Sequence, residues 1–135
     1  MSSIRLRLNP AKTKFILLGN RNQFAKLDLA ALTCTTEFPD YTFSTTVRDL
    51  GILLDQELTF ALHIHRLARD CYYHLRQLRA IARSFTPIAT TTLVHSFIAA
   101  GREYCSSLYF DLPSNRLVRL DRVLRSAARL TGQIQ

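Results

Sequence analysis

The spacing of apolar residues changes near Leu58, and this change limits what the chain can fold into. Upstream of it, short apolar runs are interrupted by Asn, Gly and Pro, as is typical of short strands and turns. Downstream of it, apolar residues recur every three or four positions, which places them along one side of a helix of about six turns. These residues are Phe60, Ile64, Leu67, Cys71, Leu75, Leu78 and Ala82.

Two further helices are expected after this one. Thr86 and Pro87 form a start signal, because threonine caps a helix and the missing N–H of proline costs nothing at the first helical position. This second helix is expected to run to about Tyr109, before Asp111–Pro113 breaks it. Ser114 can cap a third helix. The residues expected to face the core from this third helix are Leu117, Leu120, Leu124 and Ala127.

The first part of the chain carries shorter patterns. Arg5–Leu8 alternates as a half-buried strand does, and Lys14–Leu18 reads as a buried strand. Gly19–Asn22 predicts a turn. Residues 23–46 are ambiguous and include a Thr-rich loop around Pro39.

A second group of extended residues is expected further along. Tyr41, Phe43 and Val47 suggest a short strand, and Gly51–Leu54 suggests another, whose glycine permits a turn or the close approach of another backbone. The two halves together predict an α+β fold. A small antiparallel β part occupies residues 1–58, and a three-helix bundle occupies residues 59–135.

Positive charge is concentrated in the helical half. The chain has a formal net charge of +8; residues 59–135 hold 11 Arg, no Lys and 4 acidic residues, whereas residues 1–58 hold 7 basic and 6 acidic residues. Arginine grips phosphate in a bidentate manner and stacks on bases, so contact with nucleic acid is favoured over a merely solvated surface. The residues expected to bind first are Arg66, Arg69, Arg76, Arg79 and Arg83.

The arginines of the third helix follow a different pattern. All five are spread around the helix axis and are not aligned in one stripe. We expect some of them to be solvated or paired with Asp121. They are Arg116, Arg119, Arg122, Arg125 and Arg129.

Cysteine usage and hydropathy constrain the compartment. Cys34, Cys71 and Cys105 are odd in number and lack paired spacing, which favours a reduced, intracellular protein of the cytoplasm and nucleus. No apolar stretch approaches the ~20 residues of a membrane span, and the first residues lack the apolar core of a signal peptide. No membrane partner is therefore expected.

Several other site types have little support. His63 and His65 with Cys71 and His74 suggest zinc, but His63 and His65 point about 200° apart on a helix and cannot share a metal ion. We therefore expect no metal site in this chain. Tyr72 and Tyr73, the neighbours of Arg69 and Arg76, can stack on a base, although half-buried packing is the favoured use of the two rings.

Four motifs in a fixed order carry a family resemblance. Leu8–Thr13 reads Leu-Asn-Pro-Ala-Lys-Thr, and Val47–Asp55 reads Val-Arg-Asp-Leu-Gly-Ile-Leu-Leu-Asp. Tyr104–Leu108 (Tyr-Cys-Ser-Ser-Leu) and Ala127–Leu130 (Ala-Ala-Arg-Leu) follow. In this order they resemble the end of the palm and the thumb of reverse transcriptases from non-LTR, LINE-type, jockey-like retrotransposons. The resemblance covers nearly the whole chain and assigns residues 1–58 to the palm and residues 59–135 to the thumb.

The resemblance implies roles for particular residues. Lys12 takes the place of a lysine beside the incoming nucleotide, where a cation can neutralise pyrophosphate or donate a proton. By its own pattern Lys12 reads as a solvated loop lysine. Leu50 and Gly51 resemble the primer grip, which holds the 3′ end of the growing strand; by themselves they read as a buried edge strand. Asp55 is expected at a turn or helix start, not as a metal ligand. The thumb implies an RNA–DNA template–primer duplex as partner.

The resemblance also implies that catalytic parts lie elsewhere. Such polymerases hold two Mg²⁺ ions with an early Asp and an adjacent Asp-Asp pair, and this sequence contains no Asp-Asp dipeptide. The chain alone is therefore expected to lack cofactors and activity, and the Mg²⁺ ions and deoxynucleotides are expected only in a longer parent protein. Met1 is then either an internal residue of that parent or the start of a truncated copy. Gly101–Glu103 departs from the Arg-Leu-Asp usual in the family. The alternatives are a stand-alone basic helical module that binds nucleic acid and a non-functional remnant.

Overall fold

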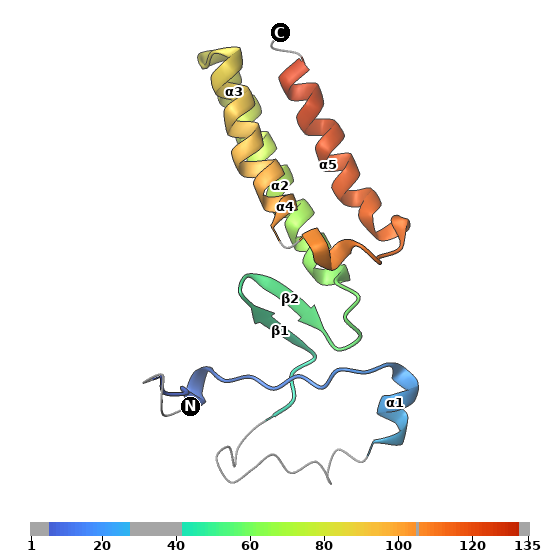
Figure 1. The fold of residues 1–135 in the computed structure, drawn as a ribbon. Helices are drawn as coiled ribbons and strands as arrows, with labels where there is room; N and C mark the ends of the chain where they lie inside the picture. The colour runs from blue at the N-terminus through green and yellow to red at the C-terminus, as the bar shows by residue number, and fades with distance from the viewer. Residues whose placement is uncertain (1–5, 28–41, 105, 133–135) are drawn as a thin grey trace. The chain divides into compact units, whose positions relative to one another are not determined.

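The computed structural model describes residues 6–27, 42–104 and 106–132. The chain divides into two units, Met1–Phe60 and Ala61–Gln135, and each is described by itself. In the described residues the first unit holds a two-stranded sheet and a short helix, and the second unit is helical (Figure 1). The expected α+β fold class is therefore confirmed.

Helix α2 (Ala61–Ile81) provides the largest part of the helical core. Ile64, Cys71, Leu75 and Leu78 are buried, and Ala82 is buried just beyond the end of the helix. This is the apolar stripe expected from the sequence, except that Leu67 is only half-buried. Ala68 takes a buried place beside the stripe.

The second helical rod is made of three segments. It begins with α3 (Pro87–Val94), continues through a π-helical turn, η5 (His95–Ala99), and ends with α4 (Ala100–Glu103). Thr86 caps it as expected, because its hydroxyl oxygen accepts a hydrogen bond from the Ala89 amide at 3.3 Å. The helix ends before the expected Tyr109 because the backbone of Tyr104 leaves the helical region, and Ser106–Tyr109 forms a separate 3₁₀ turn.

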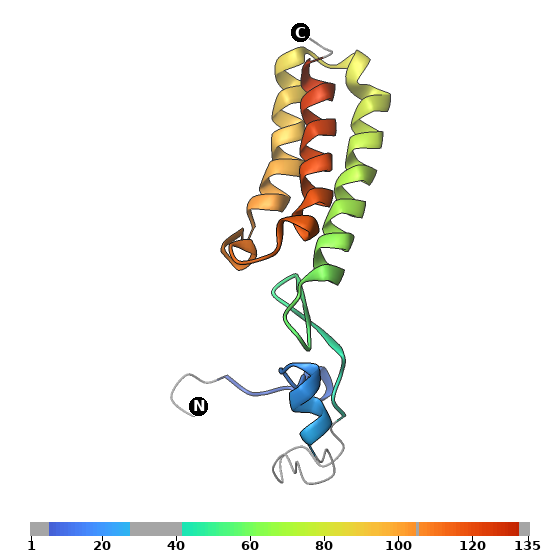
Figure 2. The ribbon, with the colours of Figure 1, turned by 90° about the vertical axis from the view of Figure 1, so that its right-hand side faces the viewer.

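Helix α5 (Ser114–Gly132) completes the helical unit, and it begins at Ser114 itself. Its buried residues are Leu120, Val123, Ala127 and Leu130, whereas the expected core residues Leu117 and Leu124 are half-buried. The stripe is rotated from the expected one because α5 packs against both α2 and α3. Figure 2 shows the three rods side by side, with α2 and α5 running in the same direction and the α3–α4 rod running against them.

The sheet of the first unit is a hairpin of β1 (Thr46–Asp49) and β2 (Ile52–Asp55). The strands are antiparallel, and Asp49 pairs with Ile52, so the loop contains only Leu50 and Gly51. Both loop residues have positive φ, 46° for Leu50 and 90° for Gly51, as a type I′ hairpin turn requires. Gly51 is therefore a turn residue and not the first residue of a strand.

Three expectations for the first unit are wrong. Residues 6–8 form no strand and are exposed, and Lys14–Leu18 contributes a single parallel bridge, between Phe15 and Phe43, with none of its residues buried. A strand needs a hydrogen-bonding neighbour along its length, and the described residues supply one only at that bridge. The expected turn at Gly19–Asn22 is instead the start of a helix, α1 (Arg21–Lys26).

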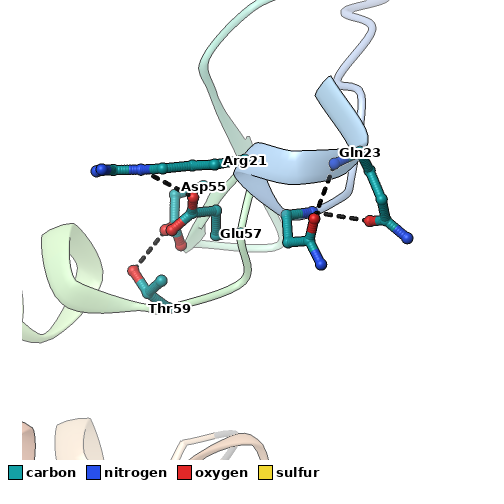
Figure 3. Close-up of polar contacts among 6 residues, drawn as sticks. Arg21, Gln23, Asp55, Glu57 and Thr59 are labelled. Carbon is teal, nitrogen blue, oxygen red and sulfur yellow. Dashed lines mark hydrogen bonds and ion pairs between the residues drawn. The ribbon is translucent and has the colours of Figure 1, made fainter. Parts of the chain in front are cut away.

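A capping box stabilises the start of helix α1. The Asn20 side chain accepts a hydrogen bond from the Gln23 amide at 2.9 Å, and the Gln23 side chain accepts one from the Asn20 amide at 2.8 Å (Figure 3). Two backbone donors that the helix leaves unpaired are thereby satisfied. The Thr-rich loop around Pro39, and with it Cys34 and Tyr41, lies outside the described residues, as does Cys105.

Candidate nucleic-acid interface

A groove of about 460 Å³ runs between α2 and α5. Both helices are amphipathic, and each turns its apolar stripe toward the core and its arginines toward solvent. Ala68, which is almost completely buried, has too small a side chain to fill the space between the helices. The lining residues are His65, Ala68, Arg69, Tyr72 and Arg76 from α2, with Arg119 and Arg122 from α5.

Arginines stand on both sides of this groove. Arg69 and Arg76 are seven residues apart on α2, close to two full turns, so they lie on the same side of that helix. Arg119 and Arg122 line the groove from α5. None of the described residues that line it is acidic, so the groove concentrates positive charge that faces solvent. We call this set of seven residues the arginine groove.

The carboxylate paired with Arg69 does little to neutralise the charge of the groove. Asp70 lies 3.9 Å from Nε of Arg69 and 3.8 Å from Nε of Arg66, and all three side chains are substantially exposed. Ion pairs of this length in solvent contribute ~0–1 kcal/mol and leave the guanidinium group available to another anion.

One hydrogen bond joins the two walls of the groove. A terminal guanidinium nitrogen of Arg119 is bonded to Nδ1 of His65. Arginine has donors and no acceptor, so Nδ1 accepts the bond and the imidazole proton resides on Nε2. The bond fixes the direction of the Arg119 side chain at the edge of the groove.

The structure separates the five arginines favoured by the sequence. Arg69 and Arg76 line the groove, whereas Arg66, Arg79 and Arg83 do not. The sequence pattern ranks Arg119 and Arg122 below these five and assigns His65 no part in binding nucleic acid. No pattern within a single helix identifies these three residues, because only the packing of α2 against α5 brings them together with Arg69 and Arg76.

The two tyrosines of α2 have different surroundings. Tyr72 is 38% exposed and lines the groove, whereas Tyr73 is 54% exposed, lies outside the groove and has its ring edge-on to His74, with 5.7 Å between centroids. The favoured expectation of half-buried packing therefore fails for Tyr73. Tyr72 keeps part of its ring open to a ligand.

The residues to which the family resemblance assigns roles in the first unit are Lys12, Leu50 and Gly51. Lys12 ends a single 3₁₀ turn, Pro10–Lys12, whose cap is Asn9, and its side chain is exposed. The Asn9 side chain accepts a hydrogen bond from the Ala11 amide at 3.1 Å, and the Thr13 hydroxyl donates to the Asn9 carbonyl at 2.8 Å. Leu50, at the tip of the hairpin, is 82% exposed.

Asp55 ends the hairpin and organises the turn that follows it. Its carboxylate accepts a hydrogen bond from the Thr59 hydroxyl (Figure 3). It also accepts one, at 2.9 Å, from the Phe60 amide. Burial by itself would raise the pKa of Asp55, but these hydrogen bonds outweigh it and lower the pKa below its ordinary value. Asp55 is thus a turn residue, as expected.

The histidines considered for zinc have other contacts. The buried His63 stacks on Tyr109, with 6.1 Å between ring centroids, and burial together with the nearby Arg66 lowers the pKa of His63. His65 binds Arg119, and His74 stacks on Phe97 at 4.9 Å. Within the described residues no group of three or more His, Cys, Asp or Glu is placed to hold a metal ion.

A second hollow, of about 590 Å³, lies within the first unit between residues 18–23 and 56–59. Arg21 crosses its edge to Glu57, with Nε 3.4 Å from a carboxylate oxygen (Figure 3). The positive charge of Arg21 and the negative charge of Glu57 cancel, so this hollow lacks the net positive charge of the arginine groove.

Comparison with known proteins adds no assignment, because no family model, no curated protein and no solved structure matches the chain. Among the residues that the structure describes, no helix combines the length and the apolar character needed to cross a membrane.

Proposed function

We propose that this chain is the end of the palm and the thumb of a LINE-type, RNA-directed DNA polymerase, and that its helical unit contacts the template–primer duplex through the arginine groove. The observation that carries the proposal is the convergence of four arginines from two helices on one groove whose described lining residues include no acid. The order of the sequence motifs supplies the polymerase part of the proposal.

The spacing of the arginines suits a phosphate backbone. Arg69 and Arg76 are about 10 Å apart along the axis of α2, at ~1.5 Å per residue. A strand of nucleic acid advances ~3.4 Å per nucleotide, so the two side chains are spaced for phosphates about three nucleotides apart. Arg119 and Arg122 supply a second set of donors across the groove. Such contacts recognise the backbone and not the base sequence.

In this proposal the first unit serves the reacting end of the duplex. Leu50 and Gly51 form the tip of a two-residue turn, where the backbone is accessible to a sugar–phosphate chain. Lys12, exposed at the end of its turn, is the cation for the nucleotide side. Catalysis requires two Mg²⁺ ions held by paired Asp residues, which this sequence does not contain, so deoxynucleotides and metal bind only in a longer polypeptide.

The salt dependence of binding tests the groove. The affinity for a fluorescein-labelled RNA–DNA hybrid is measured by anisotropy at several salt concentrations. Log K falls with log salt by roughly 0.9 for each phosphate neutralised. Replacing the four groove arginines with Gln should flatten the slope by about 3.6 units. These four are Arg69, Arg76, Arg119 and Arg122.

A matched variant separates specific contact from general charge. Arg79, Arg83, Arg102 and Arg125 are exposed and lie outside the groove, and their replacement with Gln removes the same charge. We expect this variant to change the slope by less than about one unit. Equal slopes for the two variants would assign binding to diffuse charge, and an absence of salt-dependent binding to the hybrid would refute the proposal.

The alternative function is a helical nucleic-acid-binding module without a polymerase role. It is favoured by one observation, that the groove and the core beneath it lie entirely within the second unit. Hybrids with a recessed 3′ end and with blunt ends discriminate between the two functions. The polymerase proposal predicts preference for the recessed end, reduced by Lys12→Gln and Leu50→Asn; the module predicts equal affinity and no effect of either change.

A further inference from the structure

Tyr72 lines the arginine groove and is 38% exposed. On a helix the neighbours of a residue are three and four positions away, which for Tyr72 are Ala68, Arg69, the buried Leu75 and Arg76. Ala68 is small and buried, and Arg69 and Arg76, one on each side of Tyr72 in the sequence, line the same groove. Arg122 completes the surroundings from α5. The groove therefore combines a partly exposed aromatic surface with cations on both of its walls.

This combination suits a nucleotide whose base is free to stack. An aromatic side chain and a base attract one another through their faces, and arginines at the same place bind the phosphates that flank the base. In the interior of a duplex both faces of each base are covered by its neighbours, so no face is left for Tyr72. The volume of about 460 Å³ lies within the ~300–1,000 Å³ of sites that hold small ligands, which is the size range of one nucleotide.

We infer that the arginine groove binds single-stranded nucleic acid, with one unpaired base stacked on Tyr72 between Arg69 and Arg76 and with its phosphates held from both helices. This inference rests on the proposed function for the phosphate contacts, which a duplex and a single strand share, and goes beyond it by adding a stacking contact that only a strand with unpaired bases makes. Tyr72 is the residue that makes the difference between a single strand and a duplex.

Three labelled probes test the inference with the intact chain. They are a twelve-nucleotide single strand, an abasic strand of the same length and backbone charge, and the single strand annealed to its full complement. The wild type should bind the single strand about tenfold more tightly than the abasic strand. Tyr72→Leu should remove this preference and leave the affinities for the abasic strand and the duplex unchanged.

Two further variants control for the loss of an aromatic ring and for the position of the substituted tyrosine. Tyr72→Trp keeps a stacking surface and should retain the preference, and Tyr73→Leu, outside the groove on the same helix, should leave all affinities unchanged. Circular dichroism verifies that each variant is folded.

The outcomes separate the two proposals. Binding that depends on the groove arginines but is the same for the wild type and for Tyr72→Leu overturns the stacking inference and leaves the proposed function standing. Loss of affinity for all three probes in Tyr72→Leu, with Tyr72→Trp equally weak, assigns Tyr72 a structural role and also overturns the inference. If the wild type binds none of the three probes, both proposals fail.

Discussion

Arg119 on α5 and His65 on α2, which are 54 positions apart in the sequence, are joined by a hydrogen bond at the edge of the arginine groove. The bond orients a guanidinium group that would otherwise sample many rotamers in solvent. It thereby couples the packing of α2 on α5 to the geometry of the groove.

The first prediction concerns this bond. His65→Ala removes the acceptor and should weaken binding of nucleic acid about twofold, which corresponds to the ~0.5 kcal/mol of a weak exposed hydrogen bond. His65→Gln, whose amide oxygen can accept from Arg119, should restore most of the affinity. The measurement is fluorescence anisotropy with a single oligonucleotide at fixed salt. Equal affinities for the Ala and Gln variants would show that Arg119 needs no fixed direction.

The second prediction concerns His63 and pH. The pKa of His63 is lowered in the folded protein from its ordinary value of 6.5, so the unfolded chain binds the proton more readily. The stabilising contribution of neutral His63 is fully present above about pH 6.5 and is lost as the pH falls from there through the lowered pKa of the folded protein. The urea concentration at the midpoint of unfolding should therefore decrease as the pH is lowered from about 7.5 to about 5.5.

A variant isolates this effect from the other histidines. His63→Phe preserves an aromatic ring against Tyr109 and cannot titrate. Its midpoint should change less over the same pH range than that of the wild type. An identical pH dependence in both proteins would assign the effect to other groups.

The third prediction concerns Asp55. Its pKa is lowered from the ordinary value of 3.8, so its contribution to stability is present above that pH and disappears as the pH falls below it. Asp55→Ala removes the acceptor for the Thr59 hydroxyl and the Phe60 amide at any pH. Hydrogen exchange of the Phe60 amide at neutral pH should be faster in this variant. Asp55→Asn, which keeps one acceptor oxygen, should give an intermediate rate, and unchanged exchange in both would contradict the assignment.

The fourth prediction concerns Gly101 in α4. A Cβ atom added there would lie 3.6 Å from Cδ1 of Leu67, an ordinary van der Waals contact. Alanine is favoured over glycine in a helix by ~1 kcal/mol, so Gly101→Ala should raise the melting temperature by several degrees. Gly51→Ala is the contrasting change, because φ of 90° disfavours a side chain, and it should destabilise the hairpin. A lower melting temperature for Gly101→Ala would show that the space at Leu67 is tighter than it is in the structure.

The helical half of the fold can be predicted from the sequence because its signals are local. The apolar stripe of α2 and the Thr86–Pro87 start each lie within one helix, and both predictions are confirmed. The core residues of α5 are less predictable. Val123 and Leu130 are buried because α5 meets two neighbouring helices at once, and the spacing of apolar residues in α5 does not specify that arrangement.

The first unit is harder to predict because strands depend on partners. The apolar run Lys14–Leu18 has the pattern of a strand in isolation, yet in the described part of the chain it is bridged at Phe15 alone. Helix α1 does have a local signal, since Asn20 and Gln23 have the spacing of a capping box. The same stretch also predicts a turn, because the glycine and the asparagines in it are turn formers.

Predicting the arginine groove requires both the sequence pattern and the packing of the helices. The sequence places Arg69 and Arg76 on one side of a helix, but its pattern ranks Arg66, Arg79 and Arg83 equally with them. Helix packing distinguishes between these groups, because only Arg69 and Arg76 of the five share a groove with Arg119 and Arg122.

The π-helical turn at His95–Ala99 has a consequence for how this rod tolerates changes in length. A π turn accommodates one residue more than an α turn, and each residue of an α-helix rotates the chain by about 100°. Without the π turn, one extra residue would rotate everything that follows it, Gly101 included, by that angle to another side of the rod. The π turn therefore accommodates one inserted residue within the helix, and the segments before and after it keep the same buried sides.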